Sequence, residues 1–262
     1  MMEQTVSPIL EVHDMVVSYN NRPVLWNVDF SVPKGKLVGI VGPNGAGKST
    51  LIKAIMGLVP LSSGFAKIFD NSLANVRQKV SYVPQRESVD WEFPISVREV
   101  VEMGRYSPKK IFRRLSKEDK QIAKESLEKV GMSAFADRQI SELSGGQQQR
   151  VFLARSLAQQ ADLYFMDEPF AGVDAATEKS IIELLKNLVA EGKTILVVHH
   201  DLNSALDYFD WMIMLNTRLI AAGETKDVFT AEVLQKTYGG KLSVLSQIGD
   251  LLQKQGHPVR EN

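Results

Sequence analysis

The residues with the clearest capacity for chemistry are the nine from Gly42 to Thr50, which read Gly-Pro-Asn-Gly-Ala-Gly-Lys-Ser-Thr. They fit the pattern G-x-x-x-x-G-K-[S/T], in which glycines let consecutive backbone N–H groups curve around a polyphosphate. We expect Lys48 to reach the β- and γ-phosphates and the Ser49 hydroxyl to complete a Mg²⁺ shell. The alternative is a glycine-rich turn that only opens a structural helix. The candidate phosphate-binding residues are Gly42, Pro43, Asn44, Gly45, Ala46, Gly47, Lys48, Ser49 and Thr50.

A second potential anion site opens the predicted helix that begins after Ser144. Ser144 can act as the N-cap of that helix, and the two glycines that follow allow close backbone approach to an anion. Because a Ser-Gly-Gly triplet is common in loops, the prediction of an anion site depends on where the triplet lies in the sequence. It comes after a charged helical region and just before an acidic strand end. The candidate residues of this site are Ser144, Gly145, Gly146 and Gln147.

Two carboxylates follow a strand-like run that ends at Met166. Ligands of open α/β sheets bind at the carboxyl ends of parallel strands, which is where Asp167 and Glu168 would lie. Asp167 is suited to hold Mg²⁺, directly or through water, and Glu168 to polarise an attacking water as a general base. The alternative is a solvated acidic pair that caps the next helix. Because a phosphate loop and a second anion site accompany the pair, we favour the hydrolytic role.

Gln85 and His200 each follow a strand-like run in the same way. Adjacent residues of a strand point to opposite faces, so at most one of His199 and His200 faces such a site easily. We choose His200, which directly precedes Asp201. Taken alone, either Gln85 or His200 is more simply a satisfied surface or core side chain.

The elements that position these residues alternate between strands and helices on both sides of a helical stretch. Leu37–Val41 is apolar on both faces, as expected of a central parallel strand, and leads into the phosphate loop. The helix after that loop is expected to stop at Gly57. Ile9–Tyr19 and Val24–Val32 read as antiparallel strands. The alternating pattern predicts that the second of them buries Trp26, Val28, Phe30 and Val32.

Between about Glu87 and Leu143 the strand pattern gives way to charged helical segments, including one that begins at Ser116 and closes at Gly131. The predicted organisation is an α/β core split by an inserted helical subdomain. The core takes residues 1–86 and 155–230, the helical subdomain residues 87–154, and a C-terminal extension residues 231–262. Leucine and isoleucine spacing predicts a short amphipathic helix over residues 242–256.

The composition excludes several classes of protein. The 262 residues contain no cysteine, which excludes disulfides, thiolate metal sites and cysteine nucleophiles. Lys+Arg and Asp+Glu both total 31, and this balance argues against nucleic acid as a partner. The apolar runs have strand length, well short of the roughly 20 residues that a spanning helix needs. We expect a soluble chain without a signal peptide or a membrane span.

The order of these segments resembles that of the ATP-binding subunits of ATP-binding cassette (ABC) transporters. Gly42–Thr50 matches the Walker A motif, Leu143–Gln147 the signature sequence LSGGQ, and Leu163–Asp167 the Walker B motif. The resemblance covers roughly residues 9–225. It departs slightly in the D-loop, where Gly172-Val173-Asp174 stands in place of the commoner Ser/Ala-Leu-Asp.

The resemblance implies a fold and a role for each matched residue. The fold is α/β, a P-loop NTPase with a RecA-like core, an antiparallel β subdomain and an inserted α-helical subdomain. Tyr19 would stack on adenine, Gln85 would sense Mg²⁺ and the transport partner, and His200 would contact the γ-phosphate. The catalytic residues implied are Lys48, Gln85, Glu168 and His200. The Mg²⁺ residues implied are Ser49, Gln85 and Asp167.

The resemblance also implies partners. The signature of one copy, with Asp174 of its D-loop, would close over ATP bound to a second copy, giving a head-to-tail homodimer. Separate integral membrane permease subunits would move the solute, and an extracytoplasmic metal-binding protein would act indirectly through them. The chain would lie peripherally at the cytoplasmic face of the cell membrane. Candidate permease contacts, each as readily core of the helical subdomain, are Trp91, Phe93, Pro94 and Ile95.

The prediction of the substrate class rests only on resemblance to known importers. The segments Ser88–Pro94, Val100–Arg105 and Val197–Leu202 resemble bacterial importers of manganese, zinc or iron. We expect an ATPase that drives import of a divalent metal ion, manganese first. One alternative is an importer of another solute, such as a siderophore or haem. Another is a non-transport ABC ATPase in nucleic-acid metabolism, which usually carries coiled-coil arms, tandem cassettes or a basic surface. A third alternative, a P-loop kinase or GTPase, does not account for the LSGGQ sequence. The segment from Arg105 to Arg114 contains five basic residues. We interpret them as a solvated surface, and the alternative is a surface that lies close to anionic lipid headgroups.

Overall fold

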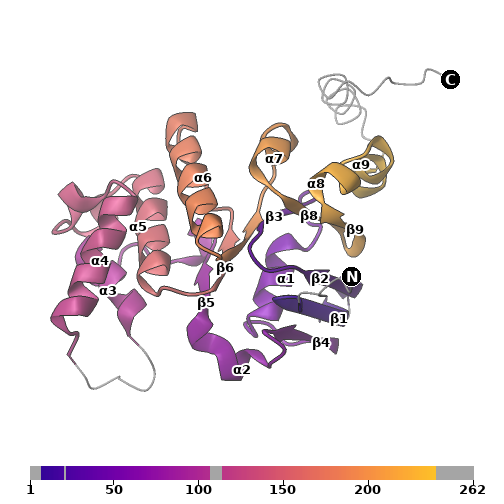
Figure 1. Cartoon of the computed structure of the whole chain (residues 1–262), viewed down its shortest axis with the longest axis horizontal. Coiled ribbons are helices and arrows are strands. Elements are labelled where there is room, and N and C mark those ends of the chain that lie inside the picture. Colours follow the sequence, from indigo (N-terminus) through magenta and orange to yellow (C-terminus); the bar gives the residue numbers. More distant parts are fainter. Residues whose placement is uncertain (1–6, 21, 107–113, 240–262) are drawn as a thin grey trace, which may run out of the picture. The chain divides into compact units, whose positions relative to one another are not determined.

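A computed structural model describes residues 7–20, 22–106 and 114–239. The chain divides into two compact units, which Figure 1 labels by their helices and strands. We call residues 1–75 and 198–262 the terminal unit, and residues 76–197 the central unit. The three-part division expected from the sequence stays a prediction.

The terminal unit contains an antiparallel sheet in the order β2-β1-β4. Its strands are β1 (Leu10–Tyr19), β2 (Arg22–Val32) and β4 (Ser63–Ile68). β1 pairs with both neighbours, so that Leu10 lies opposite Val32 on one side and Ile68 on the other. All three of these side chains are buried and form part of the unit's core.

β2 departs from the predicted alternation at one position. Val28, Phe30 and Val32 are buried as expected, but the prediction for Trp26 is wrong, since 44% of it is exposed and Leu25 is buried instead. The reason is a bulge. Met15 pairs with Val28 and Val17 with Leu25, which leaves one more residue on β2 than on β1. Asn27, in this bulge, has a φ of 50°, and the extra residue moves Trp26 to the outer face.

The strand that precedes the phosphate loop is β3 (Leu37–Val41), which is buried along its whole length as predicted. It pairs in parallel with β8 (Trp211–Asn216), and β8 pairs antiparallel with β9 (Arg218–Glu224). After the loop, α1 (Lys48–Ile55) buries Leu51, Ile52 and Ile55, and the chain turns at Gly57 with a φ of 66°. The strand, loop and helix order predicted from the sequence is confirmed.

Three further helices complete the described part of the terminal unit: α7 (Leu202–Tyr208), α8 (Thr225–Val228) and α9 (Ala231–Tyr238). The helix predicted over residues 242–256 lies outside the described residues, and so do Lys109, Lys110 and Arg113 of the basic run.

In the central unit, β5 (Val80–Val83), β6 (Leu163–Asp167) and β7 (Thr194–Val198) are neighbours in that order. β5 and β6 run parallel, so their carboxyl ends lie at the same edge. α6 (Ala175–Ala190) connects β6 to β7. The short helix α2 (Leu73–Val76) lies where the chain passes into this unit. Within the described part of the unit, 3₁₀ turns begin at Arg77, Arg86, Met103, Ser133 and Ile140.

The helical segments predicted for this unit are α3 (Val97–Glu102), α4 (Lys117–Lys129) and α5 (Gly145–Ala158), which pack against one another (Figure 1). Each begins with a serine N-cap whose hydroxyl accepts from the third helical N–H, and each N3 side chain bonds back to the cap. The predicted start of α4 after Ser116 and the turn at Gly131, with a φ of 67°, are confirmed.

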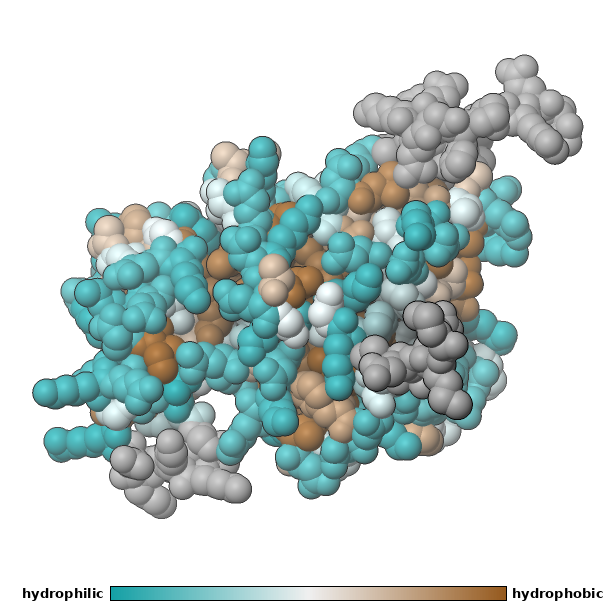
Figure 2. All heavy atoms as spheres, viewed as in Figure 1, coloured by the Kyte–Doolittle hydropathy of each residue, from teal (hydrophilic) through white to brown (hydrophobic). Residues whose placement is uncertain are grey.

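The face of the molecule in Figure 2 is mostly hydrophilic, with hydrophobic side chains in small separate groups. Such scattered apolar surface is ordinary for a folded chain. No helix within residues 7–20, 22–106 and 114–239 joins enough length to enough apolarity to cross a bilayer.

Candidate nucleotide and catalytic site

The phosphate loop, Gly42–Thr50, has a backbone that only glycine tolerates at two points. A Cβ on Gly42 would lie 2.0 Å from the Leu215 carbonyl oxygen. A Cβ on Gly47 would lie 2.6 Å from the side chain of Leu25, and Gly47 has a φ of 94°. The glycines therefore let strands β8 and β2 press against both ends of the loop, and Gly47 leads directly into α1.

Lys48 is buried, and its Nζ donates to the carbonyl oxygens of Gly42 at 2.8 Å and Pro43 at 3.0 Å. The amine thus points back into the loop rather than into solvent. Ser49 and Thr50 occupy the first turn of α1 and are partly exposed. The arrangement places a cation and a helix N-terminus on one curved segment of backbone, which is what an anionic polyphosphate requires.

A hairpin turn holds the middle of the phosphate loop. Thr217, between β8 and β9, donates its N–H to the Ala46 carbonyl at 2.9 Å and accepts from the Trp26 N–H at 2.8 Å. The two hydrogen bonds of this one residue join β2, the hairpin and the loop. Sequence reasoning did not identify Thr217, because nothing local to it signals a partner 171 positions earlier.

Tyr19 and His200, the other predicted site residues of the terminal unit, have accessible side chains. Tyr19 ends β1 and is 45% exposed, so its ring is available for stacking. His200 is exposed, whereas His199 is buried and its Nε2 lies 2.9 Å from the Ser204 hydroxyl. Burial, and next the neighbouring His200, lowers the pKa of His199 to about 4. The exposure of His200 leaves its side chain available to a ligand, and its role at the site stays a prediction.

In the central unit, Gln85 and the acidic pair lie at one edge of the sheet. Asp167 is the last residue of β6 and is fully buried, while Gln85 follows β5. The Nε2 of Gln85 donates to Oε2 of Glu168 at 3.4 Å. Glu168 has a φ of 54°, a left-handed conformation that costs about 1–3 kcal/mol for a residue with a side chain. This geometry turns the chain directly after Asp167 while keeping the Glu168 carboxylate beside Gln85.

The signature segment, Ser144–Gln147, starts α5 as predicted. The Ser144 hydroxyl accepts from the Gln147 N–H at 3.4 Å, and the Gln147 side chain accepts from the Ser144 N–H at 2.9 Å. A Cβ on Gly146 would lie 2.8 Å from the Gly172 carbonyl oxygen. Glycine at position 146 therefore permits contact between the signature segment and the D-loop.

Asp174 of the D-loop is the N-cap of α6 and is exposed. Its carboxylate accepts from the Thr177 N–H at 2.9 Å and from the Thr177 hydroxyl at 2.7 Å. These hydrogen bonds, the backbone one first, lower the pKa of Asp174 and keep it ionised. The observed capping role is compatible with a nucleotide contact, since an N-capping carboxylate stays solvent-accessible here.

Arg86 is a connecting residue that sequence reasoning missed. Its Nε and Nη2 donate to Oε1 of Gln148 at 3.3 and 3.1 Å, and its carbonyl accepts from the Trp91 indole N–H at 2.8 Å. Gln148 in turn donates to the Ile140 carbonyl at 3.1 Å. The segment after Gln85 is therefore bonded to the signature helix. Its position next to Gln85 was the signal available in the sequence.

The proposed permease contacts differ in exposure. Phe93 is 57% exposed and Pro94 is exposed, while Trp91 and Ile95 are partly buried. Trp91 packs edge-on against Phe152 with ring centroids 4.8 Å apart. Phe93 and Pro94 are therefore available to a partner, whereas Trp91 also anchors the segment to α5.

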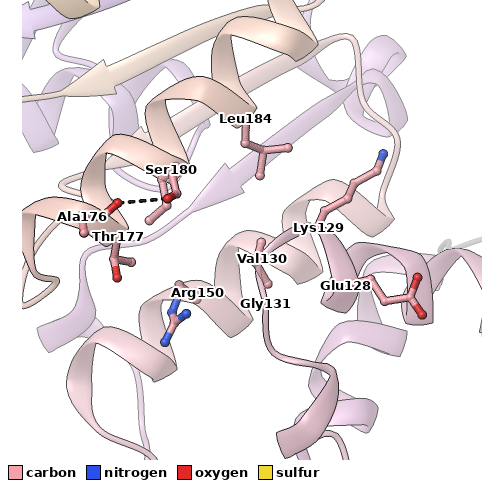
Figure 3. A pocket seen from close by; sticks show the side chains of 10 residues that line it. Glu128, Lys129, Val130, Gly131, Arg150, Ala176, Thr177, Ser180 and Leu184 are labelled. Atoms are coloured by element: carbon pink, nitrogen blue, oxygen red, sulfur yellow. Dashed lines mark hydrogen bonds between the residues drawn. The ribbon is translucent and has the colours of Figure 1, made fainter.

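A cavity of about 440 Å³ lies beside the first turns of α5 and α6 (Figure 3). Arg150, Thr177 and Ser180 line it, and the Ser180 hydroxyl donates to the Ala176 carbonyl at 3.0 Å. Its lining contains none of the predicted site residues, although Thr177 bonds to Asp174. Four of its lining residues, 128–131, come from the end of α4 and the turn after it, so the cavity lies between that end and α6.

The donor groups fit a Mg²⁺-nucleotide. Ser49, Gln85 and Asp167 offer hydroxyl, amide and carboxylate oxygens, the hard ligands that Mg²⁺ prefers. The phosphate loop supplies the anion-binding backbone, a lysine and glycines where a Cβ would clash. Ser49 and the phosphate loop belong to the terminal unit, and Gln85 and Asp167 belong to the central unit.

Comparison with known proteins places the chain among transporter ATPases. The family model described as ABC transporter matches residues 25–171. The manganese transport system ATP-binding protein MntB of Bacillus subtilis is 57% identical over 95% of this chain and 98% of its own length. The zinc transport system ATP-binding protein TroB of Treponema pallidum is 56% identical over 89% of this chain and 88% of its own.

A solved structure of a nucleotide-free ATP-binding cassette from an ABC transporter aligns with a TM-score of 0.73 and 27% identity, covering 94% of this chain and 99% of that one. The fold expected from the sequence, an α/β ABC ATPase, is therefore confirmed. Because the family model, the relatives and the fold agree, the chain belongs to the ABC transporter family. It is an ATP-binding, ATP-hydrolysing subunit of a transport system.

Proposed function

We propose that the chain powers import of a divalent metal ion, manganese first and zinc or iron next, through separate membrane subunits. The observation that carries the proposal is the identity of 57% over nearly the whole chain to a manganese transport system ATP-binding protein. The zinc transport relative at 56% identity is why the proposal names a class of ions. The transported ion is a substrate of the partner subunits in this proposal, and no residue of this chain need bind it.

In the proposed reaction, the phosphate loop binds the β- and γ-phosphates of ATP while Tyr19 stacks on adenine. Lys48, held at the loop carbonyls, exchanges those partners for phosphate oxygens. Ser49, Gln85 and Asp167 would hold Mg²⁺, which would supply positive charge to offset the charge of the phosphate oxygens. His200 contacts the γ-phosphate from its exposed position after β7.

Glu168 is the general base of the proposal. It takes the proton of the attacking water as the oxygen bonds to the γ-phosphorus and the bond to the ADP oxygen breaks. The hydrogen bond from Gln85 orients its carboxylate. Because Arg86 bonds to Gln148, a displacement of this segment by a membrane partner would reach both the base and the signature helix.

The proposed active form is a head-to-tail homodimer in which the signature segment of each copy covers ATP on the other. Ser144 and Gln147 are at least partly exposed, and Asp174 is exposed, as this role requires. The membrane partners would be permease subunits at the cytoplasmic face of the cell membrane, working with an extracytoplasmic metal-binding protein. Phe93 and Pro94 are the exposed apolar residues proposed to receive them.

Uptake of radiolabelled Mn²⁺, Zn²⁺ and Fe²⁺ tests the proposal in cells that lack this chain and then regain it. Regained wild type should restore uptake of one of these ions, and the Glu168→Gln variant should not. Restored uptake of a siderophore or haem with no effect on free metal ions would overturn the substrate assignment. Purification with nucleic acid instead of a polytopic membrane protein would overturn the transport role.

A further inference from the structure

The cavity in Figure 3 is lined by residues of the central unit, from the end of α4 and from α5 and α6. Its volume of about 440 Å³ lies within the range of small-molecule sites, roughly 300–1,000 Å³. Arg150, Thr177 and Ser180 give the lining a cation and two hydroxyl groups. Its apolar part includes Val130, Ile181 and Leu184. A lining of this composition suits a ligand with one charged end and an apolar body.

Arg150 is the cation that the fold holds in this cavity. Its Nε is buried and has no hydrogen-bond partner among residues 7–20, 22–106 and 114–239. Neither of its Nη atoms forms a hydrogen bond or an ion pair within those ranges. A Cβ on Gly131 would lie 3.8 Å from Nη1, so the guanidinium lies beside the turn that follows α4. Packing around Nε therefore fixes the side chain, while its outer nitrogens stay open to an acceptor.

The two carboxylates associated with this lining are engaged by other groups. Glu128, which lines the cavity, lies 4.0 Å from the amine of Lys124. Asp174 accepts from the N–H and the hydroxyl of Thr177. The charge of Arg150 is therefore not offset by an ion pair with either of them.

The two hydroxyl groups favour a carboxylate over a phosphate as the ligand. Thr177 donates its hydroxyl proton to Asp174 at 2.7 Å, and Ser180 donates to the Ala176 carbonyl at 3.0 Å. Both hydroxyls thus offer lone pairs rather than protons to a bound molecule. A phosphate has more charged oxygens than one guanidinium can serve, whereas a carboxylate is matched by two parallel N–H groups. Lys129, the other cation of the lining, is exposed.

We propose that this cavity binds a small aliphatic monocarboxylate, held at its charged end by the Nη groups of Arg150 and along its hydrocarbon body by Val130, Ile181 and Leu184. Such a molecule would link α5, which starts at the signature segment, to α6, which Asp174 caps. Because it binds the folded unit and not the unfolded chain, it also raises the melting temperature. The inference goes beyond the proposed function and does not depend on ATP binding.

The test uses hexanoate as the probe, with isothermal titration calorimetry and the melting temperature as readouts. Arg150→Gln should weaken hexanoate binding about ten- to hundredfold, the effect of losing hydrogen bonds from a charged group, and should remove the thermal shift. Arg98→Gln is the matched control, since Arg98 is an exposed arginine of the same unit that already pairs with Asp137 at 2.6 Å. It should bind hexanoate like wild type.

A second pair of variants tests the cavity without changing its charge. Ala176→Leu places a larger side chain at an exposed position of the lining and should also weaken binding at least tenfold. Ala190→Leu makes the same change at an exposed position of α6 outside the lining and should leave the affinity unchanged. This pair decides the matter if Arg150→Gln does not fold.

Hexylamine and inorganic phosphate complete the experiment. Binding of hexanoate that is lost in Arg150→Gln and Ala176→Leu and retained in both controls supports the proposal. Absence of hexanoate binding by folded wild type, or equal binding by Ala176→Leu and Ala190→Leu, would overturn it. Phosphate or hexylamine bound as tightly as hexanoate would show that the ligand class is wrong. Loss of ATP-dependent dimers in Arg150→Gln without any hexanoate binding to wild type would assign Arg150 to a protein partner instead.

Discussion

The phosphate loop of the terminal unit and the signature segment of the central unit both present a helix N-terminus for an anion, yet they are held differently. In the loop, Lys48 bonds to two carbonyls and Thr217 bonds to a third. In the helix that follows the signature, the buried amide of Gln149 and the buried Nε of Arg150 have no hydrogen-bond partner among the described residues. The first site is fully braced by its own unit, whereas polar groups near the second are left unpaired.

This difference agrees with the proposed division of labour. A phosphate cradle that binds nucleotide in a single chain must keep its shape alone. A segment that closes over the nucleotide of another copy must instead leave its outer face accessible, as Ser144 and Gln147 do. Variants that change one region and leave the other intact should therefore affect nucleotide binding and dimerisation separately.

The largest effect is expected from Glu168→Gln, which removes the proposed base beside Gln85 but keeps the size of the side chain. The ATPase kcat should fall by about 10²–10⁴-fold while MgATP affinity is retained, because the phosphate loop is untouched. Gel filtration with ATP should show a trapped dimer. Glu183→Gln, an exposed carboxylate on α6, is the control and should hydrolyse ATP like wild type. Full hydrolysis by Glu168→Gln would contradict the assignment of the base.

Ser144→Arg should come next, because it places a long cation on the face proposed to meet a second copy. ATP-dependent dimerisation should be abolished, with MgATP affinity of the monomer unchanged. Ser116→Arg is the control, since Ser116 caps α4 with the same reciprocal hydrogen bonds and its loss costs a similar ~1 kcal/mol. Normal dimers of Ser144→Arg in gel filtration, or loss of dimers in both variants, would refute the sandwich.

The next prediction concerns the buried His199 and the pH dependence of stability in the terminal unit. Its pKa falls from 6.5 to about 4 on folding, so the folded state binds fewer protons than the unfolded state in this range. The contribution of His199 to the free energy of unfolding is complete above pH 6.5. As the pH falls to 4, that free energy decreases by about 3 kcal/mol in total. Chemical denaturation between pH 7 and 4 should show a shallower loss of unfolding free energy for His199→Gln. Parallel curves for the variant and wild type would contradict this account.

The smallest effect concerns two adjacent glutamines of α5. Gln148 is fully bonded, to Arg86 and to the Ile140 carbonyl, whereas the equally buried Gln149 is not. Gln149→Met should raise the free energy of unfolding by about 1 kcal/mol, and Gln148→Met should lower it by about 1–3 kcal/mol. Urea denaturation of both variants checks the opposite signs. A loss of stability in Gln149→Met would show that its amide is satisfied after all.

Much of the fold was predictable because its signals are local. The apolar run of β3, the glycines of the phosphate loop and the serine caps of α4 and α5 each act within a few residues. The exception in β2 arose from a bulge, which changes the face of Trp26 through pairing with a distant strand. Alternation alone cannot contain that information.

For the candidate site, the functional residues were predictable from the sequence, whereas the residues that hold them in place through hydrogen bonds were not. Gln85 and Glu168 were identified from their places after strands, and the hydrogen bond between them agrees with that pattern. Arg86 and Thr217 were missed, because each acts through a contact far away in the sequence. Their partners are defined by tertiary packing, which no periodicity encodes.

The close approach of Gly146 to Gly172 has a consequence for sequence variation. A side chain at position 146 would displace the start of α5 from the D-loop, whereas a Cβ at position 172 would lie 4.0 Å from the Gly146 nitrogen, an ordinary contact distance. Random replacement at position 146 should yield almost no active members, and a shift of either backbone should need compensation in the other. The residue type at position 146 is thereby restricted by a segment 26 residues further along the chain.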